Sequence, residues 1–468
     1  MSDAAKLIER LVADEPALLS SLDFGPWVSQ GTGTGPSLLI GDQSEISLMR
    51  NARSSHLDHR MAHLAKPGDV VLVRQRDTKF EAYLAEYRGF SDVTFLSSGN
   101  ADADPVSKQA YNAPALLEKL IKVAQNAGGL TVNSYLTTGN TWRLAQAIGE
   151  AAKCMIRVSG PSPRVARRVN DKLWFTRLAR QVIGNDAVPP TMSAYGPDAA
   201  AALVARFGKS SEPVVVKVPD SAGSAGNIRF EAAYLNGKSP AQISSVLQDQ
   251  LHATGWADSY PILVGVWDTD VTCTPSVQLW IPHVAEGPPI SHGVFEQQVF
   301  GDAAAFVGAV RSALPDSVQR DLVAQSVKIA AVLQHLGYYG RCSFDAVICN
   351  HRADPNTIHW IECNGRWSGV SIPLAILHAI APDRDAVGIM VTQYPLSGSK
   401  VTVSQAVKAL DRGLYHHATS EDGVILLSPP PSANGSVANM LAFGNSQSAA
   451  TRSGRAAVQR LRELAKVP

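Results

Sequence analysis

The chain has 468 residues, of which 45% are hydrophobic and 18% are charged, and its formal net charge is +1. This length allows two to three domains with a sizeable core. The balanced charge argues against a nucleic-acid partner and against a disordered chain. No apolar run approaches the roughly 20 residues that span a membrane, so no membrane partner is expected.

The N-terminus and the cysteines indicate the compartment. The first residues are followed by a charged helical pattern without the apolar segment of a signal peptide. The five cysteines are an odd number, and none has C-x-x-C spacing. Reduced, buried thiols are the natural interpretation. We therefore expect a cytoplasmic protein.

Residues 1–160 show an alternation of helical and strand patterns. Apolar, β-branched runs predict strands, and amphipathic periods of 3.6 residues predict helices. The predicted strands are 37–40, 70–74, 93–96 and 131–132, and the predicted helices are 3–22, 48–64, 78–88 and 113–127. This order predicts a small α/β layer with parallel strands.

Two other features of this region invite a ligand-binding interpretation. The glycines of residues 31–35 precede a strand, whereas a dinucleotide fingerprint follows one, so direct ligand contact is the less favoured alternative. His56, His59 and His63 fall near one helix face but lack the other elements of a metal motif. A surface face is the favoured interpretation of these histidines.

A lysine follows the proline-marked boundary at residues 161–163. Asn170 or Asp171 can cap a helix N-terminus, which places Lys172 in the first turn. A cation is unfavourable there unless an anion is nearby, because helix N-termini favour negative charge. A solvated helix start is the plain alternative for Lys172 on its own.

A second lysine ends a β-branched run. Residues 213–219 predict a buried strand that carries Lys217, and such a lysine requires an anionic partner or a route to water. The small residues of 220–227 follow, with two glycines that let backbone N–H groups approach an anion. Alone this turn is more often an ordinary loop; after Lys217 it suggests a flap over phosphates.

The most informative stretch comes after two predicted helices, 302–313 and 316–336. In the predicted strand 358–366, Glu362, Asn364 and Arg366 share one face because side chains alternate along a strand. The neighbouring strand 343–348 adds Asp345. Carboxylate and amide oxygens suit a hard cation such as Mg²⁺. Solvated face residues are the plain alternative.

Taken in order, these pieces resemble the ATP-grasp ligases. They are N-D-K at a helix start, V-V-V-K, the Gly/Ser turn, G-Y-Y-G-R-C-S-F-D and I-E-C-N-G-R, over about residues 160–380. The resemblance implies an α/β (α+β) protein. It has an N-terminal Rossmann-like pre-ATP-grasp domain (1–160), a two-lobed ATP-grasp domain (161–400) and a small C-terminal α/β extension (401–468). The flap-bearing lobe would span about 210–281 and the metal-site lobe about 282–400. The tail itself shows a βαβ pattern.

The resemblance also implies the role of each site residue. The residues expected to hold ATP are Lys172, Lys217 and, in the flap, Ser221, Gly223, Ser224, Ala225 and Gly226. The residues expected to bind Mg²⁺, or Mn²⁺ in its place, are Asp345, Glu362 and Asn364. Arg366 is expected near the transferred phosphate, with Arg341 a second candidate that has a structural alternative. Ser368, Gly369 and Ser371 are expected to line the carboxylate site, with close packing as the alternative.

The hinge strand departs from the family pattern. The family usually has an acidic residue there that reads the adenine amino group, and residues 261–268 contain no Glu. Backbone groups around Val264, Val266 and Trp267 would then read adenine, and Asp268 or Asp270 would take the ribose hydroxyls. The sequence therefore leaves open which nucleotide base the protein prefers, but it predicts that the protein binds a nucleotide.

The long N-terminal segment and the run 273–281 look similar to one subgroup, the pheganomycin-type peptide ligases with a pre-ATP-grasp domain. The implied reaction activates a carboxylate as an acyl phosphate and joins it to an amine, releasing ADP and phosphate. Two alternatives stay open: a carrier-protein thiol or other acceptor, and a non-catalytic nucleotide-binding protein. A homodimer is a family expectation. The sequence names neither substrate.

Overall fold

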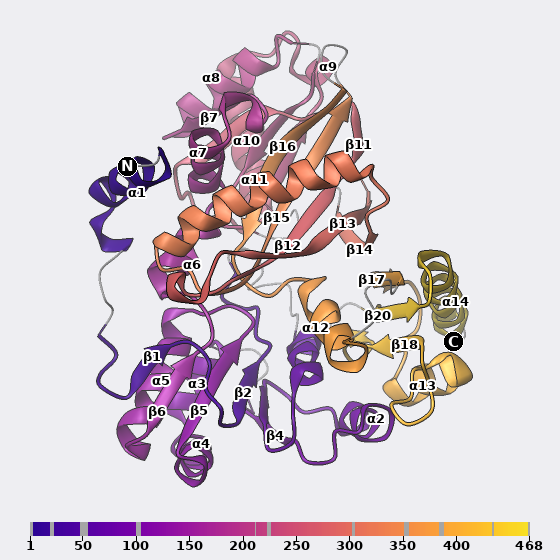
Figure 1. Cartoon of the computed structure of the whole chain (residues 1–468). Helices are drawn as coiled ribbons and strands as arrows, with labels where there is room; N and C mark the ends of the chain where they lie inside the picture. The colour runs from indigo at the N-terminus through magenta and orange to yellow at the C-terminus, as the bar shows by residue number, and fades with distance from the viewer. Residues whose placement is uncertain are drawn as a thin grey trace.

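The computed structural model describes residues 3–18, 23–46, 55–99, 104–210, 212–221, 226–301, 305–350, 355–382, 388–432 and 435–466. The predicted flap residues Gly223, Ser224 and Ala225 lie outside these ranges, as does the first part of the predicted helix 48–64. Three sheets organise the described chain, and Figure 1 shows the N-terminal sheet below the two others.

The N-terminal sheet is parallel, as the sequence predicts. Its six strands, in spatial order, are β1 (Val28–Gln30), β6 (Met155–Val158), β5 (Gly129–Ser134), β2 (Ser37–Ile40), β3 (Val70–Val73) and β4 (Thr94–Ser97). Its helices are η2 (Ser55–Leu64), α2 (Thr78–Arg88), α3 (Val106–Asn112), α4 (Pro114–Ala127) and α5 (Gly139–Ala152). The first two helices, α1 (Asp3–Asp14) and η1 (Pro16–Leu18), lie elsewhere, because Leu7 and Leu18 pack in the core that contains Phe175 and Leu333.

Helices cover both faces of this sheet. Leu38 and Ile40 of β2 pack in the same core as α3, α4 and α5, whereas Leu39 between them packs with η2 and α2. This alternation follows from the two-residue period of a strand. The predicted Rossmann-like layer is therefore confirmed.

The second sheet is small and antiparallel. It runs in the order β7 (Thr191–Ala194), β10 (Ile262–Val266), β8 (Val214–Lys217) and β9 (Asn227–Phe230). Helices α8 (Pro197–Phe207) and α10 (Pro240–Ala253) pack on one of its faces. The segments between the two sheets and within the second are α6 (Pro163–Val169), α7 (Lys172–Val182), η3 (Asn185–Ala187) and α9 (Ala232–Leu235).

The third sheet is large and antiparallel. Its path is β11 (Val271–Cys273), β15 (Gly340–Asn350), β12 (Pro275–Ile281), β13 (Ile290–Phe300), β14 (Ala305–Arg311), β17 (Gly388–Leu396), β20 (Gly435–Gly444) and β18 (Gly423–Leu426). Off this path, β16 (Pro355–Asn364) pairs with β15, and β19 (Pro431–Ser432) pairs with β20. Its helices are η4 (Val284–Glu286), α11 (Asp316–His335) and α12 (Ser371–Ile380).

The predicted helix 302–313 is wrong, because its described part is strand β14. The run is alanine-rich, but its residues bridge β13 and β17. A Cβ on Gly308 would meet the carbonyl oxygen of Val391 at 2.3 Å, so the glycine permits this close pairing. Tertiary pairing outweighs local propensity here.

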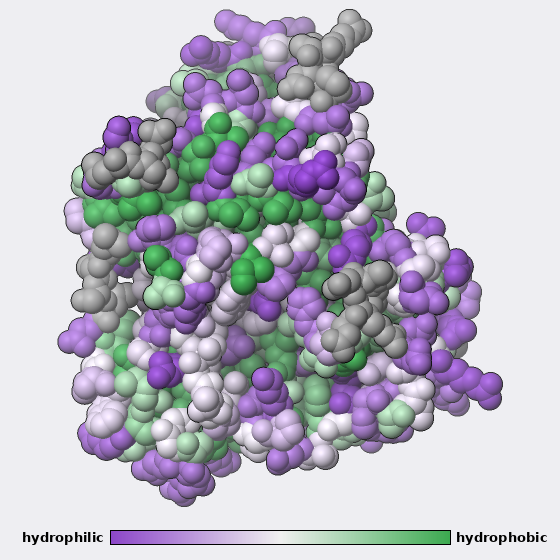
Figure 2. Space-filling model, viewed as in Figure 1, coloured by the Kyte–Doolittle hydropathy of each residue, from purple (hydrophilic) through white to green (hydrophobic). Residues whose placement is uncertain are grey.

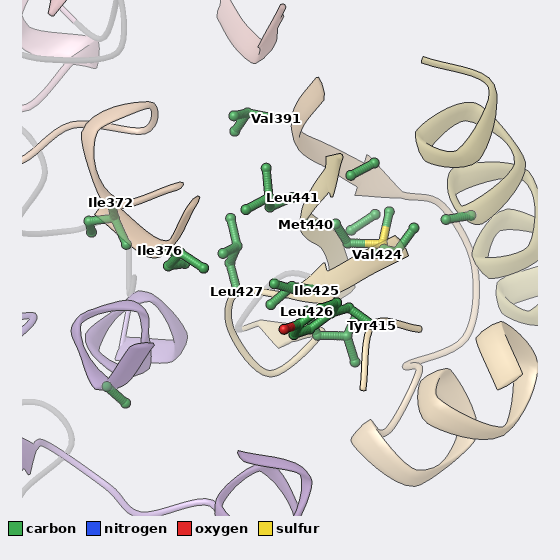
Figure 3. Packing of buried hydrophobic residues seen from close by; sticks show 14 of the residues in the cluster. Ile372, Ile376, Val391, Tyr415, Val424, Ile425, Leu426, Leu427, Met440 and Leu441 are labelled. Carbon is green, nitrogen blue, oxygen red and sulfur yellow. The ribbon is translucent and has the colours of Figure 1, made fainter. Parts of the chain in front are cut away.

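The tail contains α13 (Val403–Leu410), η5 (Asp411–Gly413) and α14 (Gln447–Lys466) besides its strands. These strands extend the large sheet in antiparallel order, so the predicted βαβ pattern is wrong, although the tail is α/β as expected. Figure 3 shows side chains of α12, β17, β18 and β20 meeting in one core. The same core includes Phe80 and Leu84 of α2, so the tail packs against the N-terminal region.

The histidine segment is buried, contrary to the surface prediction. His59 and His63 of η2 are each 3% exposed, and both lie edge-on to the Phe80 ring. Burial lowers the pKa of His59 to about 4. The segment lies in the core between the first sheet and the tail, which its own polarity does not reveal.

Polar side chains cover much of the face in Figure 2, and a green band crosses it at the level of α11. Partly buried apolar residues of α11, Val323 and Val327, pack against the core beneath. Within the described chain, no helix combines the length and the apolarity that a membrane span requires.

Candidate active site

Two carboxylates face each other across β15 and β16. Asp345 and Glu362 are directly paired in the antiparallel register, as are Ser343 and Asn364. On β15, Cys342 and Phe344 are buried in the core shared with α7 and α11, so the intervening residues face the other way. Like charges directly opposite are destabilising without a compensating cation. The structure thus brings together the two acids that the sequence singles out.

Asp345 is held by two donors. Its Oδ1 accepts a hydrogen bond from the Ser276 hydroxyl at 2.6 Å, and its Oδ2 accepts one from Nδ2 of Asn364 at 2.9 Å. Burial, and then the neighbouring Glu362 charge, raise the pKa of Asp345 to about 6. A bound cation would favour its charged form.

Glu362 is paired with the helix lysine. Asp171 is the N-cap of α7, with its side chain accepting from the N–H groups of Leu173 and Trp174. Lys172 follows in the first turn, and its Nζ lies 2.9 Å from Oε2 of Glu362. Burial opposes ionisation, but the Lys172 charge prevails and lowers the pKa of Glu362. The anion that the position of Lys172 demands is therefore Glu362.

Lys217 ends β8 close to this pair. Burial, followed by the Lys172 charge, lowers the pKa of Lys217 to about 8, while Glu362 and Asp268 act in the opposite direction. Lys172 and Lys217 therefore both lie within the electrostatic influence of Glu362.

The flap has a tightly built base. The hydroxyl of Ser221 donates to the carbonyl of Val218 at 2.9 Å, and Nζ of Lys172 donates to the Ser221 hydroxyl and carbonyl at 3.1 and 2.5 Å. The N–H of Val218 donates to the carbonyl of Gly226 at 2.9 Å. A Cβ on Gly226 would lie 2.6 Å from Oγ of Ser221, so a glycine is required.

Arg366 is fixed by two amides. Its Nη2 donates to Oδ1 of Asn364 at 2.5 Å, and its Nη1 donates to Oδ1 of Asn170. Asn170 also accepts from the N–H of Gly365 at 3.1 Å. The sequence indicates Asn170 only as a possible helix cap. In the structure, the Asn170 side chain connects the junction between α6 and α7 to the segment after β16 that carries Arg366.

Arg341 occupies a different place. Its guanidinium lies 5.3 Å from the ring centre of Trp280 and 5.7 Å from that of Trp367, which are cation–π distances. It lines a small cavity with Arg366, not the larger cavity beside Asp345 and Glu362. The geometry supports the structural alternative for Arg341.

The hinge strand offers fewer donors than expected. Val264 is fully buried in the core of the second sheet. The N–H of Val266 donates to the carbonyl of Pro190 at 3.0 Å, and that of Trp267 to Pro213 at 2.9 Å. These two N–H groups are therefore engaged within the protein and are not free to read adenine.

A cavity of about 560 Å³ borders this hinge. Its lining residues are Arg180, Asn185, Asp186, Val188, Pro190, Glu212, Val266, Asp268, Thr357 and His359. Oδ2 of Asp268 lies 3.0 Å from Nδ1 of His359, so this carboxylate already has a partner. Asp270 is exposed and does not line the cavity. Glu212 is an acidic group on the cavity wall that the hinge sequence itself did not indicate.

A second cavity, of about 310 Å³, adjoins the paired carboxylates. The metal-strand residues Asp345, Glu362, Asn364 and Arg366 line it together with Ser368 and Gly369, as the sequence predicts for neighbouring sites. Ser371 does not line it; its hydroxyl accepts from the N–H of Ser368 at 2.7 Å at the start of α12, so its role is structural.

The opposite part of this cavity comes from the N-terminal region. Gln43, Ile46, Leu57, Arg60 and Tyr135 line it, and sequence reasoning missed all five. They lie about 200 residues or more from the metal strands in the chain, so no local motif connects them. Leu57 and Arg60 lie on η2, whose burial the sequence does not reveal, so no sequence signal marks them.

A domain model and solved structures show what this chain is similar to. The pre-ATP-grasp domain model matches residues 58–150. No curated protein matches the chain by sequence. Among solved structures, biotin carboxylase from Campylobacter jejuni aligns with a TM-score of 0.56 and 14% identity, over 91% of each chain.

Two further structures align over similar lengths. The biotin carboxylase domain of 2-oxoglutarate carboxylase from Hydrogenobacter thermophilus has a TM-score of 0.55 and 12% identity, over 92% of this chain and 90% of its own. N5-carboxyaminoimidazole synthetase from Staphylococcus aureus has a TM-score of 0.53 and 11% identity, over 92% of this chain and 100% of its own. A pre-ATP-grasp domain model therefore matches part of the N-terminal region, and the chain shares the fold of these solved structures over more than 90% of its length.

Proposed function

We propose that this protein is an ATP-dependent ligase that activates a substrate carboxylate as an acyl phosphate and joins it to an amine. The supporting observation is the pair Asp345 and Glu362, opposed across two strands, with Lys172 on Glu362 and a cavity beside them. The similar structures were solved with β,γ-ATP, with ADP, and with MgADP and bicarbonate. ATP and Mg²⁺ are the cofactors this donor set fits.

The residues present fit a divalent cation. Two carboxylates, one with a raised pKa, and an amide oxygen two residues further along the strand form an all-oxygen set. Asp345, Glu362 and Asn364 would hold the ion, and Mn²⁺ satisfies the same ligands. When bound, Mg²⁺ neutralises charge on the transferring phosphate.

The protein side chains then have separate tasks. Lys172 and Lys217 bind phosphate oxygens, and the flap anchored at Ser221 and Gly226 excludes water from the acyl phosphate. An oxygen of the substrate carboxylate attacks the γ-phosphorus and ADP leaves. The amine attacks the acyl carbon, phosphate leaves, and the nitrogen loses a proton. Arg366, oriented by Asn170 and Asn364, stabilises the anionic intermediate.

The finer assignment is a peptide ligase of the pheganomycin type that acts on amino-acid or natural-product substrates. The pre-ATP-grasp domain supports it. The proposal includes three alternatives. The acceptor is a carrier-protein thiol in place of the amine, the substrate is a peptide, or the protein is a homodimer. The H. thermophilus domain was solved as a dimer.

The test is release of ADP and phosphate with MgATP, pooled carboxylates and pooled amines, with thiol and bicarbonate arms alongside. Release should require both pools and vanish in Glu362→Ala. Glu86→Ala, an exposed position on α2, is the matched control and should keep it. Release with carboxylates and thiols alone would replace the amine. Bound nucleotide without release in any arm would refute the ligase and favour a binding protein.

A further inference from the structure

Arg60 is a buried cation without a counter-charge. It is 2% exposed in η2, and among the described residues no carboxylate forms an ion pair with it. Its Nη2 donates to the carbonyl of Gly369 at 3.2 Å, whereas its Nε has no hydrogen-bond partner. A buried charge that is not paired is costly, so this arginine calls for an anionic ligand.

Two acids of the N-terminal region, Asp42 after β2 and Asp58 on η2, have other partners. Oδ1 of Asp42 lies 2.8 Å from Nη2 of Arg74, and Oδ2 of Asp58 accepts from the backbone N–H of Arg74 at 3.2 Å. Burial and the Asp42 charge raise the pKa of Asp58 to about 8, which keeps it neutral at ordinary pH. Neither acid neutralises Arg60.

Arg60 lines the same cavity as the paired carboxylates of β15 and β16. Gly369, whose carbonyl accepts from Arg60, also lines this cavity, and a Cβ on it would crowd the Phe306 ring at 3.0 Å while leaving Nη2 of Arg60 at an ordinary contact distance of 3.9 Å. Gln43, on the same cavity wall, is 6% exposed, and its Nε2 is buried without an acceptor. Two buried donor groups without full acceptors thus meet on one wall.

The other residues that line the cavity determine the size and the polarity of the ligand that fits it. Amide and hydroxyl groups of Gln278, Gln297 and Ser368 alternate with the apolar side chains of Ile46, Leu57 and Phe306. A cavity of about 310 Å³ accommodates a small molecule that carries both polar and apolar groups.

We propose that Arg60, assisted by Gln43, binds the free carboxylate of the amine substrate, so that this substrate is an amino acid or a short peptide. The inference rests on the proposed ligase activity and names its acceptor. The carboxylate that is phosphorylated must lie at the end where Arg366 and the lysines gather. Arg60 therefore requires a second anion. A guanidinium binds the oxygens of a carboxylate. Arg60 is thus suited to hold a carboxylate that does not react.

The test compares acids with their amides on the full-length protein. Thermal shift and calorimetry would measure binding of the standard amino acids and glycylglycine, each beside its carboxamide, with MgADP present. The wild type should bind at least one acid roughly tenfold to a hundredfold more tightly than its amide, as expected for hydrogen bonds to a charged group. Arg60→Met should abolish this preference, and Arg60→Lys should keep part of it.

The matched control is Arg88→Met. Arg88 is also a buried arginine, stacked on Phe90 and Tyr415, but it does not line the cavity, so its loss should leave the preference intact. Equal binding of acid and amide in the wild type would overturn the inference, as would no binding of any acid or a preference that survives Arg60→Met.

The two proposals fail in different ways. A preference for acids without any ADP release would refute the ligase and keep the carboxylate site. ADP release that simple amines stimulate as well as amino acids, without a preference in binding, would keep the ligase and refute the role of Arg60.

Discussion

The ammonium group of Lys172 lies 2.9 Å from Oε2 of Glu362, and this ion pair joins the first turn of α7 to the strand that faces Asp345. This cation therefore offsets the charge of one of the two carboxylates that face each other across β15 and β16. The lysine thus has a structural task before any nucleotide binds.

Removing the Lys172 ammonium group alone should destabilise the protein more than removing it together with the charge of Glu362. Lys172→Met removes the ion-pair partner of Glu362 opposite Asp345, so the free energy of unfolding should fall by roughly 3 kcal/mol. The double variant Lys172→Met, Glu362→Gln should recover part of this loss, because the repulsion with Asp345 disappears. Urea unfolding without Mg²⁺ measures both. Additive losses would show that the pair is not coupled.

The affinity for ADP should depend on the protonation of Lys217. Its pKa is lowered to about 8 by burial and by Lys172, so the ammonium is lost as the pH rises through that value. ADP affinity should therefore fall between about pH 7 and 9, because the neutral amine no longer attracts phosphate. Lys217→Arg stays charged and should bind ADP with a flat profile over this window. The same fall in both proteins would assign the titration to another group.

Substitutions of Arg366 and Arg341 should affect different quantities, namely ADP release for Arg366 and stability for Arg341. Arg366→Met should lower ADP release by two orders of magnitude or more, roughly as loss of one stabilising donor does, with little change in stability. Arg341→Met should lose about 1 kcal/mol of stability, because its contacts are with the Trp280 and Trp367 rings. It should keep most of its ADP release. A release defect in Arg341→Met equal to that of Arg366→Met would contradict its structural role.

The flap base should not tolerate a side chain at Gly226. In Gly226→Ala the added Cβ meets Oγ of Ser221 at 2.6 Å and Cβ of Val218 at 2.9 Å, so the turn must shift. We expect ADP affinity to fall about tenfold and stability to fall by about 1–3 kcal/mol. Gly139→Ala, where nothing lies within 4 Å of the new Cβ, is the control and should behave as wild type. Unchanged ADP affinity in Gly226→Ala would show that the base of the flap is adaptable.

Local sequence rules predicted the parts of the site that depend on local structure. The cap at Asp171 fixes where α7 begins, and the two-residue period of β16 aligns Glu362 and Asn364. Arg366 lies two residues beyond the end of β16, so the predicted strand extends too far. The opposing pair across β15 and β16 followed once both strands were assigned. These features depend on a few neighbouring residues, which the chain displays directly.

The remaining features depend on distant parts of the chain. β14 is a strand because β13 and β17 flank it, and the histidines of η2 are buried because the tail covers them. Arg60 lines the cavity because the η2 segment that carries it is buried in the same way. In the hinge, the N–H groups of Val266 and Trp267 are occupied by carbonyls from other segments. None of these relationships has a local pattern, so sequence alone gave an incomplete or wrong prediction.

The core that joins α2 to β18 and β20 sets the order in which the site can form. During synthesis the N-terminal sheet emerges first, yet the helices η2 and α2 on one of its faces lack their outer packing partners until β20 and α14 have been made. Such non-local contacts form late and leave apolar surface exposed in the meantime. The wall that carries Arg60 therefore reaches its final packing only after β20 and α14 have been made, and a chain that stops near residue 400 would keep the residues that line the cavity but lack the tail that packs against η2 and α2.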